Sequence, residues 1–350
     1  MSENSETPVE VLPAAPSLPS ARKRFSVLGF GIAIYTAVSF SVAMIIQIIA
    51  MIIDPGLLDN SVFLNIVSPV ALYIFALPCL IGVLALFKVK GDAPEKREMG
   101  ILPLLLIFVV SFGLMYIGSY VGQGVMWGFT EMVGYDYSNA LESMIDYDYM
   151  WVTAIFMCVV APIGEEFVFR KLIIDRTHKY GGFVSILFSG LVFGLMHGNF
   201  YQFFYAFALG LVLGYLYYST GNVWYCVGIH AGINFMGSVV TSYLDLGTTN
   251  MNNALETLDI ENVDAVAAFG EKYWFILVAF LAFFAFMLIS MLSAIVLPIV
   301  FRKKIVLERG EPLLSRKVAF GVSFLNVGVI AMLLLYAFNF VLNLIPPAVG

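Results

Sequence analysis

Long uninterrupted apolar runs are the feature that most constrains the fold of this chain. A helix needs about 20 apolar residues to cross the hydrocarbon core of a bilayer. The expected spans are 26–53, 66–87, 101–130, 149–171, 183–198, 201–219, 222–243, 273–301 and 318–345. Only 12% of the residues are charged, about half the share found in soluble domains. The sequence therefore predicts an all-α fold, a polytopic membrane bundle of about nine transmembrane helices.

Lysine and arginine are distributed unevenly between the connecting segments. If the first span enters the membrane from the cytoplasm, every one of them except Lys272 falls on the inner side or at the inner end of a span. Basic residues concentrate in cytoplasmic loops of membrane proteins. The pattern predicts an N-terminus inside and a C-terminus outside, with an acidic outer loop between Asp245 and Glu271.

Two adjacent carboxylates and an arginine interrupt the fourth apolar span, as Glu165, Glu166 and Arg170. Ionisable groups at membrane depth are costly and mark functional sites by default. Glu166 and Arg170 are four residues apart, so they share a helix face and can neutralise each other. Glu165 is offset by about 100° of helix turn and has no such partner nearby. One carboxylate is then structurally occupied and the other is available for chemistry.

Two histidines also lie inside apolar spans. His197 is in the fifth span, whereas His230 is in the seventh and shares a helix face with Asn234. The residue midway between Glu165 and His197 falls at the Gly181-Gly182 break, so an antiparallel hairpin places these two at similar depth. A straight hairpin would misplace His197 and His230 by about 20 Å. Tilt, a turn at Gly198 or bending within the sixth span can absorb this offset.

Taken in order, these residues form three short motifs. They are Glu165-Glu166-x-x-x-Arg170, Phe193-x-x-x-His197 and His230-x-x-x-Asn234. Residues 150–240 thereby resemble the CAAX-protease and bacteriocin-processing family of intramembrane proteases, also called the Abi or type II CAAX prenyl endopeptidase family. The other spans resemble only membrane helices in general. The resemblance implies endopeptidase activity on a membrane peptide or a membrane-anchored protein.

Peptide hydrolysis needs a base that activates water and donors for the tetrahedral oxyanion. Glu165 and His197 fit the first role, and His230 with Asn234 fits the second. The resemblance implies the same allocation, with Glu166 and Arg170 as the pair that positions Glu165. It also suggests Phe193 as a wall of the substrate site and Asn199 as a substrate-binding neighbour.

Two other mechanisms stay open at the level of the sequence. No cofactor is required by the motifs, but Glu165, His197 and His230 are a possible ligand set for zinc with an open fourth position. The HExxH arrangement of many zinc proteases is absent. Cys226 lies four residues before His230 and could form a nucleophilic dyad with it, although buried cysteines are commonly inert.

The resemblance and the charge pattern together suggest four regions. They are a disordered cytoplasmic tail (1–25), N-terminal transmembrane helices (26–148), a catalytic core (149–243), and C-terminal transmembrane helices that include the acidic outer loop (244–350). Residues 171–179 are expected to continue the fourth span along the inner surface, with His178 in solvent.

Three function classes are compatible with these observations. The leading hypothesis is an intramembrane endopeptidase in a bacterial plasma membrane, with a leader peptide or bacteriocin precursor as substrate. The alternatives are a non-catalytic scaffold or bacteriocin immunity protein, and a proton- or cation-coupled transporter, which the lack of internal repeats disfavours. No basic tract suggests binding to nucleic acid.

Overall fold

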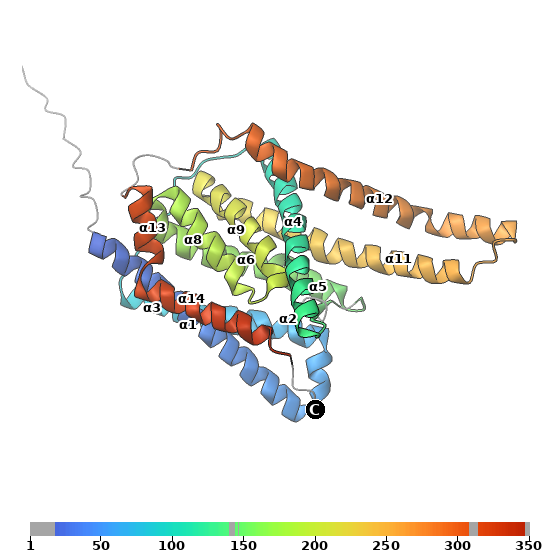
Figure 1. Cartoon of the computed structure of the whole chain (residues 1–350), viewed down its shortest axis with the longest axis horizontal. Coiled ribbons are helices and arrows are strands. Elements are labelled where there is room, and N and C mark those ends of the chain that lie inside the picture. Colours follow the sequence, from blue (N-terminus) through green and yellow to red (C-terminus); the bar gives the residue numbers. More distant parts are fainter. Residues whose placement is uncertain (1–17, 140–143, 146, 308–313, 347–350) are drawn as a thin grey trace, which may run out of the picture.

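The computed structural model describes residues 18–139, 144–145, 147–307 and 314–346. Every regular element in these ranges is a helix (Figure 1). The first part contains α1 (Leu18–Ile53), η1 (Pro55–Asp59), α2 (Ser61–Pro69), η2 (Val70–Ala76), α3 (Leu77–Leu86) and α4 (Ile101–Val133). The central part contains α5 (Met150–Ile155), η4 (Phe156–Val160), α6 (Ala161–Glu166), η5 (Phe167–Ile174), α7 (Asp175–Thr177), η6 (His178–Tyr180), α8 (Gly182–Met196), α9 (Phe200–Thr220), α10 (Val223–Asn234), η7 (Phe235–Val240) and α11 (Thr241–Glu256). The last part contains α12 (Val263–Val300), α13 (Arg316–Phe324) and α14 (Val327–Asn343).

The expected membrane bundle is confirmed, but the expected number of spans is not. Over the described ranges, 7 helices are long and apolar enough to cross a membrane, or 8 if α13 and α14, which meet at a 61° bend, form one span. The expected span that does not qualify is the fifth, which corresponds to α8 and has only 15 residues. At 1.5 Å per residue this helix is about 22 Å long, shorter than a typical hydrocarbon core of about 30 Å. The inside and outside assignment stays a prediction.

Two boundaries differ from those expected. Helix α1 begins at Leu18, within the expected tail, because Ala21 and Phe25 are fully buried against Tyr180 and Val322. Residues 1–17 of that tail lie outside the described ranges. The expected acidic loop is largely helical, since α11 continues to Glu256 and α12 starts at Val263. These two helices form a hairpin that extends away from the rest of the bundle (Figure 1).

Helix α4 crosses the bundle and packs closely against α9 at two glycines. A Cβ atom on Gly118 would lie 2.5 Å from the Cα of Tyr205, and one on Gly122 would lie 2.5 Å from the carbonyl oxygen of Phe200. Both distances are shorter than any ordinary contact. Small residues permit this approach of helix backbones in membranes, where association depends on close packing and not on exclusion of water.

Candidate active site

The helix that carries the first motif is continuous from Met150 to Tyr180 but irregular within this range. Two π-helical segments, η4 and η5, lie on either side of α6, the short α-helical stretch that contains Glu165 and Glu166. Such widened turns are rare and occur frequently at functional sites. The irregularity changes which backbone groups need outside partners around the two carboxylates.

Glu166 and Arg170 form the ion pair expected from their spacing. Arg170 Nε lies 2.8 Å from Glu166 Oε2, and both side chains are fully buried. Arg170 also donates from Nη2 to Glu166 Oε1 at 3.2 Å and from Nη1 to Ser189 Oγ at 3.1 Å. The guanidinium group lies 5.3 Å from the centroid of the Phe193 ring. The arginine therefore joins the motif helix to α8 and compensates the buried carboxylate.

His230 lies between the two carboxylates of the motif. Its Nδ1 is 3.0 Å from Glu166 Oε1, and its Nε2 is 3.7 Å from Glu165 Oε2. A carboxylate can only accept here, so Nδ1–H of His230 donates to Glu166 Oε1, which fixes the tautomer of the neutral ring. The other nitrogen then faces Glu165, slightly beyond hydrogen-bonding distance.

Glu165 is the accessible carboxylate of the motif. Its side chain is 19% exposed, whereas that of Glu166 is 0% exposed. The hydroxyl groups of Tyr35, Tyr73 and Tyr205, which come from three other helices, lie in the neighbourhood of the Glu165 carboxylate. The structure thus separates the two glutamates, with one held inside the packing and one left available.

His197 lies at the end of α8 and is linked to the other polar residues through Phe193. Its Nδ1 is 2.9 Å from the Phe193 carbonyl oxygen. If Nδ1 donates the proton of a neutral imidazole, Nε2 keeps its lone pair. The Phe193 ring meets both imidazoles in edge-on contacts, with centroid distances of 5.2 Å to His197 and 5.6 Å to His230. Over the described part of the chain, no hydrogen bond or ion pair joins His197 to Glu165, and their expected joint action on a water molecule stays a prediction.

Asn234 reaches the motif helix through a backbone carbonyl. Its Nδ2 donates to the Met157 oxygen at 2.7 Å. In the π-helical register of η4, in which the Ala161 amide bonds to the Phe156 oxygen, the next donor would be residue 162. Residue 162 is a proline and has no N–H group. The side chain of Asn234 thus replaces a missing backbone hydrogen bond, in addition to any role towards a substrate.

The two residues expected to contact a substrate are engaged within the protein. Phe193 is 1% exposed and packs edge-on against Phe169, with a centroid distance of 4.9 Å. Asn199 caps α9 by accepting from the Gln202 amide at 3.0 Å, and it donates to the His197 carbonyl at 2.8 Å. Both side chains position the neighbouring histidine, and their expected contact with substrate stays a prediction.

The residues suggested for zinc do not form a ligand group. No three His, Cys, Asp or Glu side chains in the described ranges are grouped so that they could hold a metal ion. His230 directs one nitrogen to Glu166 and the other to Glu165. His197 uses its Nδ1 on the Phe193 carbonyl. Glu165, His197 and His230 in this arrangement do not fit a zinc centre.

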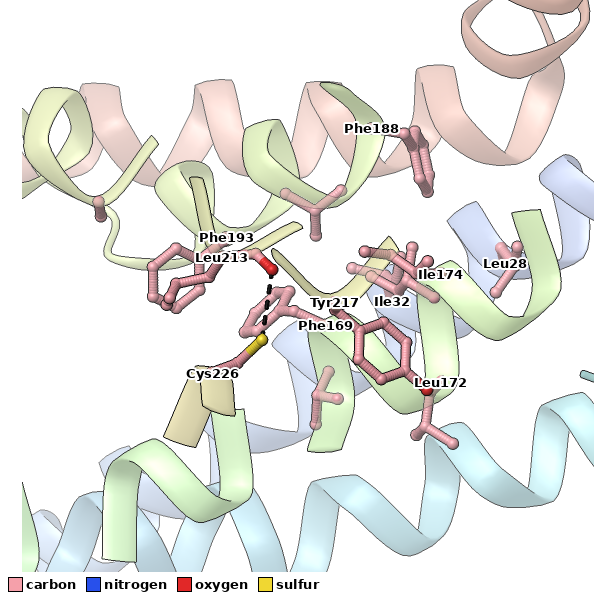
Figure 2. Packing of buried hydrophobic residues seen from close by; sticks show 14 of the residues in the cluster. Leu28, Ile32, Phe169, Leu172, Ile174, Phe188, Phe193, Leu213, Tyr217 and Cys226 are labelled. Atoms are coloured by element: carbon pink, nitrogen blue, oxygen red, sulfur yellow. Dashed lines mark hydrogen bonds between the residues drawn. The ribbon is translucent and has the colours of Figure 1, made fainter. Parts of the chain in front are cut away.

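Cys226 belongs to the hydrophobic core beneath the site. It is fully buried and its thiol donates to the Leu213 carbonyl at 3.4 Å, among Phe169, Phe193 and Tyr217 (Figure 2). It therefore acts as a packing residue, and nothing exposes its sulfur to a substrate.

The C-terminal end of the motif helix, residues 171–180, differs from the expectation. Leu172, Ile173 and Ile174 are buried in the main hydrophobic core, so the apolar face of this segment packs against the protein. Its position at the membrane surface stays a prediction. His178 was expected in solvent, but both of its ring nitrogens are buried, and neither has a hydrogen-bond partner within the described part of the chain. The segment is buried because the loop after α3 covers it, with the Asp92 amide donating to the Asp175 oxygen at 2.8 Å.

Two residues outside the three motifs support the site and were not identified from the sequence. Tyr73 donates to the Ala161 carbonyl at 3.3 Å and lies so close to Gly164 that a Cβ atom there would be 2.3 Å from its ring. Asn343 donates to the Gly198 carbonyl at 2.9 Å, in the turn directly after His197, where Gly198 has a φ of 72°. Gly164 inside a charged motif and Gly198 after a histidine were the available signals, but neither identifies its partner.

Comparison with known proteins agrees with the motifs. Residues 148–236 match the model of the Rce1-like family, described as type II CAAX prenyl endopeptidase Rce1-like. This segment is Rce1-like. The match covers about a quarter of the chain. It contains all three motifs, the first on α6 and η5, the second at the end of α8 and the third on α10. No curated protein and no solved structure matches the chain.

The Rce1-like segment supports a coarse functional statement. The family is one of intramembrane CAAX proteases, and the chain has the multiple apolar helices of a multi-pass membrane protein. The helices that flank the segment contribute Tyr73 and Asn343 to the surroundings of the motifs. The candidate site is therefore assembled by the whole bundle and not by the matched segment alone.

Proposed function

We propose that this protein is an intramembrane endopeptidase that hydrolyses a peptide bond in a membrane-associated substrate, with Glu165 as the general base. The observation that supports this most strongly is the asymmetry of the two glutamates. Glu166 is fully buried and compensated by Arg170, whereas Glu165 is 19% exposed and faces an imidazole nitrogen. A site that only needed to pack two helices would not require the second carboxylate.

The proposed reaction uses groups that the chain itself supplies. Glu165 takes a proton from a water molecule, and the resulting hydroxide attacks the carbonyl carbon of the scissile peptide bond. His197, whose Nδ1 is held by the Phe193 carbonyl, orients the same water through the lone pair on its Nε2. The oxygen of the tetrahedral intermediate accepts a hydrogen bond from Nε2–H of His230 in its doubly protonated form, in which Nδ1–H donates to Glu166. The proton on Glu165 then passes to the leaving amine as the C–N bond breaks.

Asn234 has a double assignment in this proposal. Its amide can act as an oxyanion donor only if it leaves the Met157 carbonyl, with which it forms a 2.7 Å hydrogen bond. Catalytic hydrogen bonds are often incomplete in the absence of substrate and form only in the complex. In this proposal Asn234 therefore donates to the Met157 carbonyl in the free protein and to the oxyanion once the substrate is bound.

The substrate class follows from the family and from the membrane setting. The family name specifies CAAX prenyl endopeptidases, whose substrates carry a prenylated C-terminal motif. We propose either such a lipid-anchored C-terminus or a leader peptide that lies on the membrane. A bacterial plasma membrane, which would favour the leader peptide, stays a prediction.

The decisive experiment is the replacement of Glu165 by glutamine in the reconstituted full-length protein. Cleavage of prenylated and non-prenylated membrane peptides should fall by about 10²- to 10⁴-fold, the usual contribution of a general base. The thermal midpoint should change little because glutamine has the shape of glutamate and the contact of Glu165 with His230 is long, at 3.7 Å. The exposed Glu131→Gln on α4 is the matched control and should retain full activity. Undiminished cleavage by Glu165→Gln would refute the proposal and favour a non-catalytic scaffold.

A further inference from the structure

An open groove of about 850 Å³ lies between the first turns of α1 and the bend that joins α13 to α14. Figure 1 shows the start of α1 beside α13 at one end of the bundle. None of the residues of the candidate active site lines this groove. It therefore requires a separate explanation.

One wall of the groove is basic. Arg22 and Lys23 both line it, and both are exposed. Within the described ranges neither side chain takes part in a hydrogen bond or ion pair. The neighbouring Arg24, by contrast, donates to the Lys90 carbonyl at 2.6 Å. Two cations without a protein partner thus face the groove.

The opposite wall is apolar and strongly exposed. Leu325 is 66% exposed and Val327 is 71% exposed, on either side of the bend, and Ile330 continues the wall along α14. The polar residue at the bend, Asn326, is 5% exposed and uses its side chain within the turn, accepting from the Val329 amide at 3.0 Å and donating to the Ser323 carbonyl at 2.9 Å. This wall therefore offers hydrocarbon and not hydrogen bonds to an occupant.

We propose that the groove binds an anionic phospholipid from the surrounding bilayer. Its phosphate would lie against Arg22 and Lys23, and an acyl chain would cover Leu325 and Ile330. Basic pockets between helices at the end of a membrane span are suited to anionic headgroups. A free phosphate ion would satisfy only the basic wall and would leave the apolar wall exposed. The assignment of a phospholipid therefore depends on the presence of a basic wall and an apolar wall in the same groove.

The headgroup contact can be tested by removing the two charges. The full-length protein would be reconstituted in nanodiscs that contain equal amounts of phosphatidylglycerol and phosphatidylcholine. Native mass spectrometry of the protein released from the nanodiscs would then count the lipid molecules that stay bound to it. The Arg22→Gln/Lys23→Gln variant should lower the preference for phosphatidylglycerol by roughly 30-fold, which corresponds to about 1 kcal/mol for each basic side chain. Arg302→Gln/Lys303→Gln, an exposed basic pair at the end of α12, is the charge-matched control. An equal effect in both variants, or none in either, would overturn the proposal.

The acyl-chain contact can be tested by filling the groove without changing its charge. Gly321 lines the groove, and a Cβ atom there would meet no other atom within 4 Å. Gly321→Leu should therefore fold normally and reduce lipid retention. Gly82→Leu is the matched control, because Gly82 on α3 is also free of neighbours but lies outside the groove. Equal retention by these two variants would contradict an acyl chain in the groove.

Two other occupants have distinct signatures in the same experiment. If inorganic phosphate at millimolar concentration displaces the retained lipid completely, the groove recognises the phosphate alone and the lipid assignment is wrong. If phosphatidylglycerol is retained only after deletion of residues 1–17, those residues occupy the groove and the proposal again fails. Retention that is unchanged by both treatments supports the lipid.

Discussion

Two long helices of this protein, α12 and the motif helix, differ in how much of their surface is buried and in how many polar groups they carry. Helix α12 is α-helical over all of its 38 residues, with one proline, Pro298, near its C-terminal end, and only Met287, Ser290 and Ala294 along it are buried. The motif helix, residues 150–180, is similarly long. In its most apolar stretch of 18 residues, 39% of the stretch is buried inside the protein, compared with 11% in the corresponding stretch of α12. The first helix is almost entirely apolar and faces outwards, whereas the second carries two carboxylates and an arginine into the bundle.

The difference lies in where each helix finds its hydrogen bonds. A regular α-helix satisfies its own backbone within the membrane and needs no neighbours for this purpose. The motif helix has two π-helical segments and a proline, so some of its carbonyl groups depend on side chains from other helices, namely Tyr73 and Asn234. Its charged groups depend on Ser189 and His230 in the same way. The motif helix can therefore keep its shape only inside the assembled bundle.

The largest effect should come from removing the cation of the motif helix. Arg170→Ala leaves the fully buried Glu166 without its ion pair, and breaking one partner of a buried pair costs about 3–5 kcal/mol. The measurement is the free energy of unfolding in detergent. Arg302→Ala, at the exposed end of α12, is the matched control and should change stability by less than about 0.5 kcal/mol. Similar values for the two variants would mean that Arg170 is not required to compensate the charge of Glu166.

Replacing a glycine by alanine should change stability in opposite directions in the two helices. Gly164→Ala places a Cβ atom 2.3 Å from the Tyr73 ring and should destabilise the protein by about 1–3 kcal/mol through overpacking. Gly270→Ala on α12 meets nothing within 4 Å and should stabilise its helix by about 0.5–1 kcal/mol. Thermal midpoints measured in the same detergent test both. A neutral Gly164→Ala would show that Tyr73 can move away and is not a fixed brace.

The role of Asn234 can be resolved with a pair of substitutions. Asn234→Ala leaves the Met157 carbonyl without its donor and should cost about 1–3 kcal/mol. Pro162→Ala restores an N–H group to the backbone, so in this background the same substitution should cost less, which a double-mutant cycle measures. If Asn234 also binds the oxyanion, cleavage activity stays low in the double variant even though stability recovers. Recovery of both would assign Asn234 to bracing alone.

The sequence was sufficient for the parts of the site that depend on local spacing. The pairing of Glu166 with Arg170 was predicted because residues four apart meet on one helix face, and the structure contains it. The membrane bundle was predicted from apolar runs for the same reason, since length and hydropathy decide whether a segment can cross a bilayer. The approach of His230 to the first motif was predicted only as a convergence of costly polar groups.

Other features depend on tertiary contacts that a single sequence does not specify. Spacing alone placed Glu165 and His197 at similar depth, but the imidazole that Glu165 approaches to 3.7 Å is that of His230, which comes from α10. The π-helical segments were missed since helix periodicity hardly changes when one residue is added to a turn. His178 was assigned to solvent from its charged neighbours, yet the loop after α3 covers its helix.

The smallest effect concerns the C-terminal end of the motif helix, where an exposed ion pair joins it to the loop after α3. Lys179 donates to Asp92 at 2.7 Å, and this hydrogen bond, together with the charge of Lys179, keeps the pKa of Asp92 below its ordinary value of 3.8. A carboxylate with a lowered pKa stabilises the folded state above its ordinary pKa, and this contribution is lost as the pH falls through the lower folded value. Both side chains are more than half exposed, so the contribution is at most about 0.5 kcal/mol. Asp92→Asn should therefore lower the thermal midpoint slightly at pH 6 and not at pH 3, and Lys179→Gln should match it without further loss in the double variant. A difference that persists at pH 3 would show that the Asp92 side chain does not act through its ionised carboxylate, because the substitution leaves its backbone contact with Asp175 unchanged.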